Sequence, residues 1–179
     1  MKKKTKLIVR EWVESLLIAF ILAMLIRTFI VQAFKIPTSS MKPTLMCGDR
    51  ILVNRFIYRF KKPERWDVVV FKYPLDRKKP FIKRLVAEQG EKITIANGRV
   101  FINGQMIDNP HLPEYYYNRG DYGRQGLKID VPEDKLFVLG DNSFNSKDSR
   151  YWGFVPKKDL VGKAFLIYWP LNRIKILNK

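Results

Sequence analysis

The sequence contains one cysteine and one histidine among its 179 residues. Cys47 alone cannot form an intrachain disulfide, and one cysteine with one histidine cannot build a Cys/His metal cluster within a single chain. His111 lies in Asn-Pro-His-Leu-Pro, a pattern that is typical of a loop. A serine or cysteine hydrolase on this chain would therefore need a base other than imidazole, unless His111 serves, and we expect no metal or other cofactor.

Acidic residues are also scarce, since 17 Asp and Glu stand against 34 Lys and Arg and leave a formal net charge of +17. The hydrophobic fraction of 46% and the aromatic fraction of 13% exclude a disordered chain. The length fits one globular unit with a sizeable core and excludes a large multidomain assembly.

One long apolar segment lies near the N-terminus. Every residue of 16–26 is apolar, and residues 12–31 supply the roughly 20 residues that a helix needs to cross a bilayer. Five basic residues within 2–10 predict a cytoplasmic N-terminus. Because no small-x-small motif closes the run, we favour an uncleaved anchor over a cleavable signal peptide or a buried core helix. The sequence thus predicts a basic cytoplasmic N-terminus at 1–11, a transmembrane anchor at 12–31 and an extracytoplasmic domain at 32–179.

The positive charge is concentrated just after this segment, since residues 27–84 contain 15 basic and 4 acidic residues. Aromatic residues lie among the basic ones at Phe56, Tyr58, Phe60 and Trp66, a combination that is also found in nucleic-acid-binding surfaces. In a domain tethered to a bilayer, anionic lipid headgroups are the simpler partner. We therefore expect anionic membrane lipids as a partner and no nucleic acid.

The rest of the chain shows short segments rich in β-branched and aromatic residues, which predict strands. The expected strands are 67–73, 81–87, 92–96, 99–102, 135–139 and 163–169. Asn97-Gly98 and Asn103-Gly104 are strong hairpin signals, because a type I′ turn needs positive φ at both central residues. Residues 110–126 predict a long surface loop. We expect an all-β domain of short, mostly antiparallel strands on one N-terminal transmembrane helix.

Four sequence blocks carry the candidate chemistry. They are Ile-Pro-Thr-Ser-Ser-Met-Lys-Pro-Thr-Leu at 36–45, Gly-Asp-Arg-Ile-Leu-Val-Asn at 48–54, Phe-Ile-Lys-Arg at 81–84, and Gly-Asp-Asn at 140–142 leading into Ser-Lys-Asp-Ser-Arg-Tyr-Trp-Gly at 146–153. Together and in this order, the blocks resemble those of the type I signal peptidases, the bacterial leader peptidases. The resemblance runs from the anchor to about residue 156.

The resemblance implies a membrane-bound serine endopeptidase that removes signal peptides from exported precursor proteins with a Ser/Lys dyad on an all-β catalytic domain. By motif position, Ser40 resembles the nucleophile and Lys83 the general base. Thr38 resembles the hydroxyl residue that completes the oxyanion hole with the Ser40 amide, and Ser146 resembles the residue that orients the lysine ammonium. The supporting ion pairs that the resemblance implies are Asp148 with Arg150 and Asp141 with Arg84.

Elementary chemistry favours the same dyad. A serine hydroxyl is a weak nucleophile until a base takes its proton, and a neutral lysine is the plausible base where histidine is scarce. The lysine pKa must first fall from about 10.4, which burial among apolar groups achieves. On a strand, Lys83 shares one face with Phe81 and Leu85, while Arg84 points to the other face.

Motif position decides between close alternatives. Lys42 is the nearest competing lysine, but it lies in a polar loop that offers no desolvation. The residues alone do not separate Ser39 from Ser40. The family usually has an Arg-Asp pair after Gly-Asp-Asn, whereas this sequence has Ser143-Phe144, so the charges for a local salt bridge are absent there. Ser146 and the residues after it stay in register.

The resemblance also implies a substrate class and a location. The expected substrates are secretory preproteins with small residues at positions −1 and −3, which bind as an added strand at the bacterial plasma membrane. The expected topology is single-pass, with a cytoplasmic N-terminus and an extracytoplasmic catalytic domain. Two alternatives are a tethered β-domain that binds lipid or nucleic acid without catalysis, and a Ser/Lys peptidase of the self-cleaving repressor type.

Overall fold

The computed structural model describes residues 2–25 and 31–177. Helix α1 spans Lys2–Leu25, and strand β1 spans Val31–Lys35. The anchor predicted at 12–31 is wrong at its C-terminal boundary, because Val31 already pairs with Asn54; residues 26–30 lie outside the described residues. An apolar run that ends in β-branched and aromatic residues fits a strand as well as a helix, which explains the error. Within the described residues, no helix is long and apolar enough to cross a membrane.

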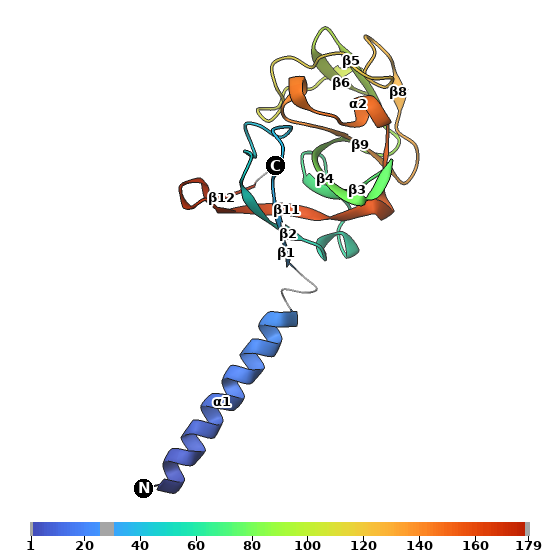
Figure 1. Cartoon of the computed structure of the whole chain (residues 1–179). Coiled ribbons are helices and arrows are strands. Elements are labelled where there is room, and N and C mark those ends of the chain that lie inside the picture. The colour runs from blue at the N-terminus through green and yellow to red at the C-terminus, as the bar shows by residue number, and fades with distance from the viewer. Residues whose placement is uncertain (1, 26–30, 178–179) are drawn as a thin grey trace.

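An antiparallel sheet of eight strands makes up the larger part of the β-structure (Figure 1). Its order is β1-β2-β11-β3-β4-β9-β10, and β12 also pairs with β11. The further bounds are β2 Arg50–Asn54, β3 Val68–Tyr73, β4 Asp76–Ala87, β9 Lys135–Leu139, β10 Val155–Pro156, β11 Leu160–Trp169 and β12 Lys175–Ile176. Because β4 lies beside β9, Arg84 pairs with Leu139, and the segment that follows β9 starts next to Lys83.

A second antiparallel sheet has the order β7-β6-β5-β8. Its strands are β5 Lys92–Ala96, β6 Arg99–Ile102, β7 Gln105–Met106 and β8 Ile129–Asp130. Asn97-Gly98 and Asn103-Gly104 join β5 to β6 and β6 to β7, and all four residues have positive φ between 50° and 83°. The predicted hairpin turns are therefore confirmed, since positive φ at both central positions is what a type I′ turn requires.

The buried apolar side chains form three clusters, and one of them holds the segment around residue 40 in place. Ile36, Met41 and Leu45 pack there against side chains of β2, β3 and β11. Another cluster joins the smaller sheet to β4 and β9 and includes Tyr116, which is only 1% exposed. The loop at 110–126 is thus not purely a surface segment, because Tyr116 is part of the core.

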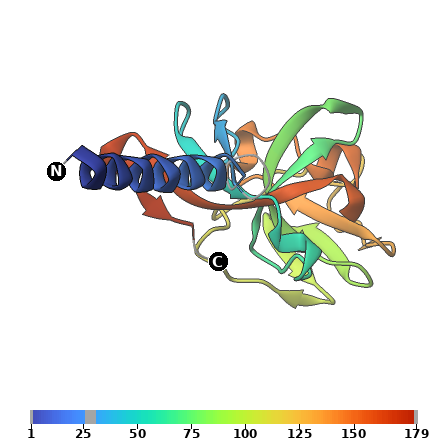
Figure 2. The ribbon, with the colours of Figure 1, turned by 90° about the horizontal axis from the view of Figure 1, so that it is seen from below.

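All six predicted strands are present, and the mostly antiparallel β-fold is confirmed. Strands β4 and β11 begin at Asp76 and Leu160, earlier than predicted, and β1, β2, β7, β8, β10 and β12 were not predicted. The one α-helix of the described residues after β1 is α2, Ser149–Trp152, which Asp148 caps through its side chain. Short 3₁₀ helices lie at Ile57–Arg59, Ser143–Asn145, Lys157–Asp159 and Leu171–Arg173. In Figure 2 the long strand β11 crosses the middle of the domain, where it links β2 to β3.

Candidate active site

Ser40 and Lys83 meet although 43 residues separate them in the sequence. Lys83 Nζ lies 2.7 Å from Ser40 Oγ and donates to Ile82 O at 2.9 Å. Lys83 occupies β4 opposite Val69 of β3, so the sheet fixes the lysine. The serine loop is fixed by Met41, which follows Ser40 and is fully buried. Packing on both sides therefore holds the two side chains in contact.

Burial gives Lys83 the properties of a base. Its side chain is nearly fully buried, and desolvation lowers its pKa from 10.5 to about 8, because the charged ammonium is disfavoured away from water. The nearby carboxylates of Asp148 and Asp141 oppose this shift, and Arg150 adds to it. A substantial neutral fraction of Lys83 is therefore available close to neutral pH, next to a serine hydroxyl.

Two further hydroxyls lie close to this pair. Thr38 Oγ1 is 3.4 Å from Ser40 Oγ. Ser146 is 5% exposed, and its Oγ has no hydrogen-bond partner among the described residues. A Cβ built on Gly140 would approach Ser146 Oγ to 2.1 Å and Ser40 O to 2.6 Å. The absence of a side chain at Gly140 therefore makes room for Ser146 and for the nucleophile loop.

Two buried ion pairs frame the site, and both are bidentate. Arg84 binds Asp141 through Nε at 2.8 Å and Nη2 at 2.6 Å. Arg150 binds Asp148 through Nε and Nη2, both at 2.8 Å. Side chains in both pairs are at most 1% exposed. Asp148 also accepts from Gly140 N at 3.0 Å, so this pair holds the residue that packs against Ser146.

The segment at Ser143 and Phe144 is held by a hydroxyl and by a ring contact. Ser143 Oγ accepts hydrogen bonds from Arg150 Nη1 at 3.0 Å and from Tyr117 N at 2.8 Å. Phe144 is 62% exposed, and its ring lies edge-on to Tyr117 with centroids 5.5 Å apart. A neutral hydroxyl and an aromatic contact thus fix this segment beside the loop at 110–126.

The dyad opens onto a cleft of about 740 Å³. Its walls come from the nucleophile loop, from the start of the buried part of β4, and from the segment after β9. Its described lining includes no Asp or Glu. The lining residues are Pro37, Thr38, Ser39, Ser40, Cys47, Pro80, Phe81, Ile82, Lys83, Arg119, Phe144, Asn145, Ser146, Lys147 and Tyr151.

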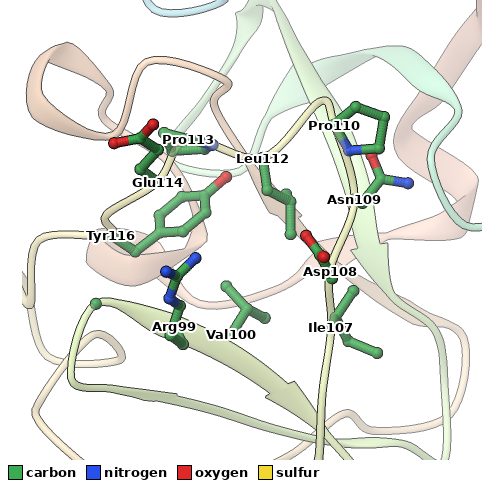
Figure 3. A pocket seen from close by; sticks show the side chains of 11 residues that line it. Arg99, Val100, Ile107, Asp108, Asn109, Pro110, Leu112, Pro113, Glu114 and Tyr116 are labelled. Carbon is green, nitrogen blue, oxygen red and sulfur yellow. The ribbon is translucent and has the colours of Figure 1, made fainter.

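A separate pocket of about 260 Å³ lies over β6 (Figure 3). Tyr116 points into this pocket, between the loop at 107–114 and the β6 residues Arg99 and Val100. The hydroxyl of Tyr116 donates to Gly140 O at 3.2 Å. Tyr116 therefore connects this pocket to Gly140. The lining of the pocket contains neither Ser40 nor Lys83.

Several residues that support the site were not singled out from the sequence. Asn142 donates from its backbone N to Ser40 O at 3.0 Å and from Nδ2 to Ser39 O at 3.1 Å, which ties the serine loop to the segment after β9. Thr44 Oγ1 donates to Asp141 Oδ2 at 2.5 Å. Both residues lie inside the sequence blocks quoted above, so these motifs could have identified them. Arg119 lies outside every block, so no sequence motif pointed to it.

The competing residues form no such Ser/Lys contact among the described residues. Ser39 Oγ is bonded to Asn145 Nδ2 rather than to a base. Lys42 and His111 do not line the cleft. Within the described residues there is also no group of three or more His, Cys, Asp or Glu side chains that could hold a metal ion.

Comparisons with known proteins agree on one family. Residues 9–169 match the family described as "Signal peptidase, peptidase S26". A probable signal peptidase I-2 of Synechocystis sp. is 40% identical over 189 residues, which cover 99% of this chain and 82% of that protein. Signal peptidase I P of Bacillus subtilis subsp. natto is 37% identical over 183 residues, which cover 97% of this chain and 95% of that protein.

A solved structure is also similar to part of the chain. The signal peptidase I of Enterococcus faecalis V583 is 31% identical and has a TM-score of 0.49. The similarity covers 57% of this chain and 97% of that structure.

Proposed function

We propose a specific reaction for this chain, which belongs to the signal peptidase family, peptidase S26, and is a serine endopeptidase. The reaction is cleavage of N-terminal signal peptides from exported preproteins by a membrane-bound Ser/Lys dyad. The observation that carries the proposal is the 2.7 Å contact between Lys83 Nζ and Ser40 Oγ in an open cleft. Family membership gives the substrate class, and the geometry supports the residues.

In the first half of the reaction, neutral Lys83 takes the hydroxyl proton of Ser40, and Ser40 Oγ attacks the scissile carbonyl carbon. The resulting Lys83 ammonium then gives this proton to the departing amine as the C–N bond breaks, which leaves an acyl ester on Ser40. In the second half, Lys83 takes a proton from water, which attacks the ester carbonyl. As the C–O bond of the ester breaks, the Lys83 ammonium gives this proton to the departing Ser40 Oγ, so Ser40 and Lys83 return to their starting states and the acid product is released.

Thr38 and Ser146 assist this cycle at different points. Thr38 Oγ1, close to Ser40 Oγ, donates to the oxyanion together with the Ser40 backbone amide. Ser146 Oγ is a buried hydroxyl without a partner among the described residues, so it is free to accept from the ammonium that forms on Lys83. Asp148 and Asp141, held by Arg150 and Arg84, stabilise that positive charge and keep the segment after β9 in position.

The cleft supports the expected substrate class. An extended precursor would pair with the strand edge that ends in Lys83, with small side chains at positions −1 and −3 facing the cleft. The lining beside Lys83 includes Phe81 and Ile82, whose apolar side chains offer no partner for a charged residue at those positions.

We also propose that α1 anchors the enzyme in the bacterial plasma membrane. Nine large apolar side chains between Trp12 and Met24 are 49–68% exposed, and such surface is stable only when something apolar covers it. The described part of this anchor would be 12–25, with residues 1–11 in the cytoplasm and residues 32–179 on the other side. Comparing protease protection of the two ends of the chain in sealed vesicles tests this topology.

Anionic lipids are the proposed partner of the segment after β2. Arg55, Arg59, Phe60, Lys61 and Lys62 are exposed there, and none of the four cations forms an ion pair with a described residue. Each basic residue near an anionic surface contributes about 1 kcal/mol. A fluorophore placed by Phe60→Cys in a Cys47→Ser background should be quenched by quencher-bearing lipids in anionic bilayers and much less in neutral ones.

The experiment that tests the proposed reaction is incubation of the detergent-solubilised full chain with a secretory precursor, followed by mass analysis of the products. We expect one cut after a small-x-small sequence, and no cut when the residue at −1 is replaced by a bulky one. If the chain bound anionic bilayers but left several precursors intact, the result would instead support a tethered binding domain without catalysis.

A further inference from the structure

The loop at 110–126 places one arginine in the wall of the catalytic cleft. Arg119 lines the same cleft as Ser40 and Lys83. Its guanidinium lies 4.8 Å from the ring centroid of Phe144 and 5.3 Å from that of Tyr117, and its Nη1 donates to Phe144 O at 2.9 Å. Phe144 is also the residue at which this chain departs from the family's usual Arg-Asp pair. The aromatic ring thus supports a cation at the cleft wall.

The backbone on both sides of Arg119 is firmly held. Before it, Tyr117 donates its N–H to Ser143 Oγ and its carbonyl accepts from the buried Arg150 at 2.8 Å. Asn118 Nδ2 donates to Ile95 O and Gly123 O. After it, a Cβ on Gly120 would come within 2.3 Å of Arg150 O, so the backbone there lies directly against α2. Arg119 is therefore presented from a fixed loop, which lowers the entropy cost of binding a ligand.

The cleft around Arg119 is electropositive. Lys147, an exposed residue, lines the same cleft, and no carboxylate belongs to its described lining. Within the described residues, Arg119 has no acidic partner, and Nη1 is its one donor group with a hydrogen-bond acceptor. Cations without carboxylates favour a ligand carboxylate by direct pairing and disfavour a ligand ammonium by repulsion.

We propose that Arg119, stacked on Phe144, is a specificity-determining residue that binds a carboxylate side chain of the precursor within a few residues of the scissile bond. The inference rests on the proposed peptidase function and deepens it, because it concerns the same cleft. It gives the loop at 110–126 a role in substrate selection. It also predicts that precursors with a lysine at the same position are poor substrates.

The test uses the full chain in detergent with matched peptides that carry Asp or Asn at one position, scanned over the three residues on each side of the cut. We expect one position at which the parent cleaves the Asp peptide with a kcat/KM about 5–10-fold higher than the Asn peptide. The preference should weaken at high salt, because screening reduces the attraction between partly exposed charges.

Arg119→Gln should abolish this Asp preference, so that the Asp and Asn peptides are cleaved with equal kcat/KM. Arg119→Lys should keep part of the preference, because the charge remains and the planar stacking on Phe144 is lost. The matched control is Arg124→Gln in the same loop, since Arg124 is exposed and pairs with Asp121 outside the cleft. This control should behave as the parent.

The inference is overturned if the parent cleaves every Asp and Asn pair equally, or if Arg119→Gln retains the preference. A parent that cleaves none of the peptides and no precursor would instead contradict the proposed peptidase function. The two failures are therefore distinguishable in one set of assays.

Discussion

Lys83 Nζ lies 2.7 Å from Ser40 Oγ, in surroundings that lower the pKa of Lys83 to about 8. The base is active only when it is neutral. We therefore expect kcat/KM of the parent to rise with pH through about 8 and to level off above it. A pH profile measured with one peptide substrate checks this. A profile that is flat between pH 6 and 10 would show that Lys83 does not act as the base.

The burial of Lys83 also lowers the free energy of unfolding of the parent. The folded pKa of about 8 lies below the ordinary 10.5, so the unfolded chain binds more protons between these values, and stability should rise with pH across that window. At pH 7, Lys83→Met should be more stable than the parent by on the order of 3 kcal/mol, and the difference should shrink toward pH 10.5. Chemical unfolding at several pH values measures it.

The exposed Lys128 offers a control for that experiment. Lys128→Met removes one surface lysine that does not line the cleft, so its unfolding curves are the reference against which those of Lys83→Met are compared. If Lys83→Met were less stable than the parent at every pH, the proposed desolvation of the lysine would be contradicted.

The hydroxyl of Thr38 lies 3.4 Å from Ser40 Oγ and is assigned to the oxyanion. Removing one preorganised oxyanion donor typically costs about 10²–10³ in rate, so Thr38→Ala should lower kcat by that order while KM changes little. Thr38→Ser keeps the hydroxyl and should retain most of the activity. Equal kcat for Thr38→Ala and the parent would remove Thr38 from the mechanism.

Gly140 has no room for a side chain, because a Cβ would approach Ser146 Oγ and the Ser40 carbonyl oxygen. Gly140→Ala should therefore displace the nucleophile loop, lower activity strongly and destabilise the fold by about 1–3 kcal/mol. Adding Ser146→Ala removes only the shortest of three close contacts, because the Cβ of residue 146 and the Ser40 carbonyl oxygen would each still lie 2.6 Å away, so this second change should restore little of the stability and none of the activity. Thermal unfolding and peptide cleavage, measured side by side, separate these effects.

Local sequence patterns predicted the strands whose boundaries are set by residues adjacent in the sequence. The segments 92–96, 99–102 and 135–139 match β5, β6 and β9 because alternation and two Asn-Gly turns define them locally. Strands β1 and β2 were missed because their pairing is with each other and with β11, far along the chain. The predicted anchor also included Val31, because an apolar run does not indicate where a helix ends and a strand begins.

The residues of the candidate site could be predicted only where they lie in recognisable sequence motifs. Sequence chemistry alone left Ser39 and Ser40 equivalent, and the structure separates them because Ser40 faces Lys83 while Ser39 faces Asn145. The position of Arg119 in the cleft could not be predicted, because it depends on a loop without regular structure, in which the Tyr117 carbonyl accepts from Arg150 and the Tyr117 N–H donates to Ser143 Oγ.

The most direct test of the dyad is cleavage of a secretory precursor by the parent, Ser40→Ala and Lys83→Met, each shown to be folded in detergent. The account predicts correct processing by the parent and none by either variant at any pH between 6 and 10. Processing by Ser40→Ala or by Lys83→Met at a rate near that of the parent would contradict it.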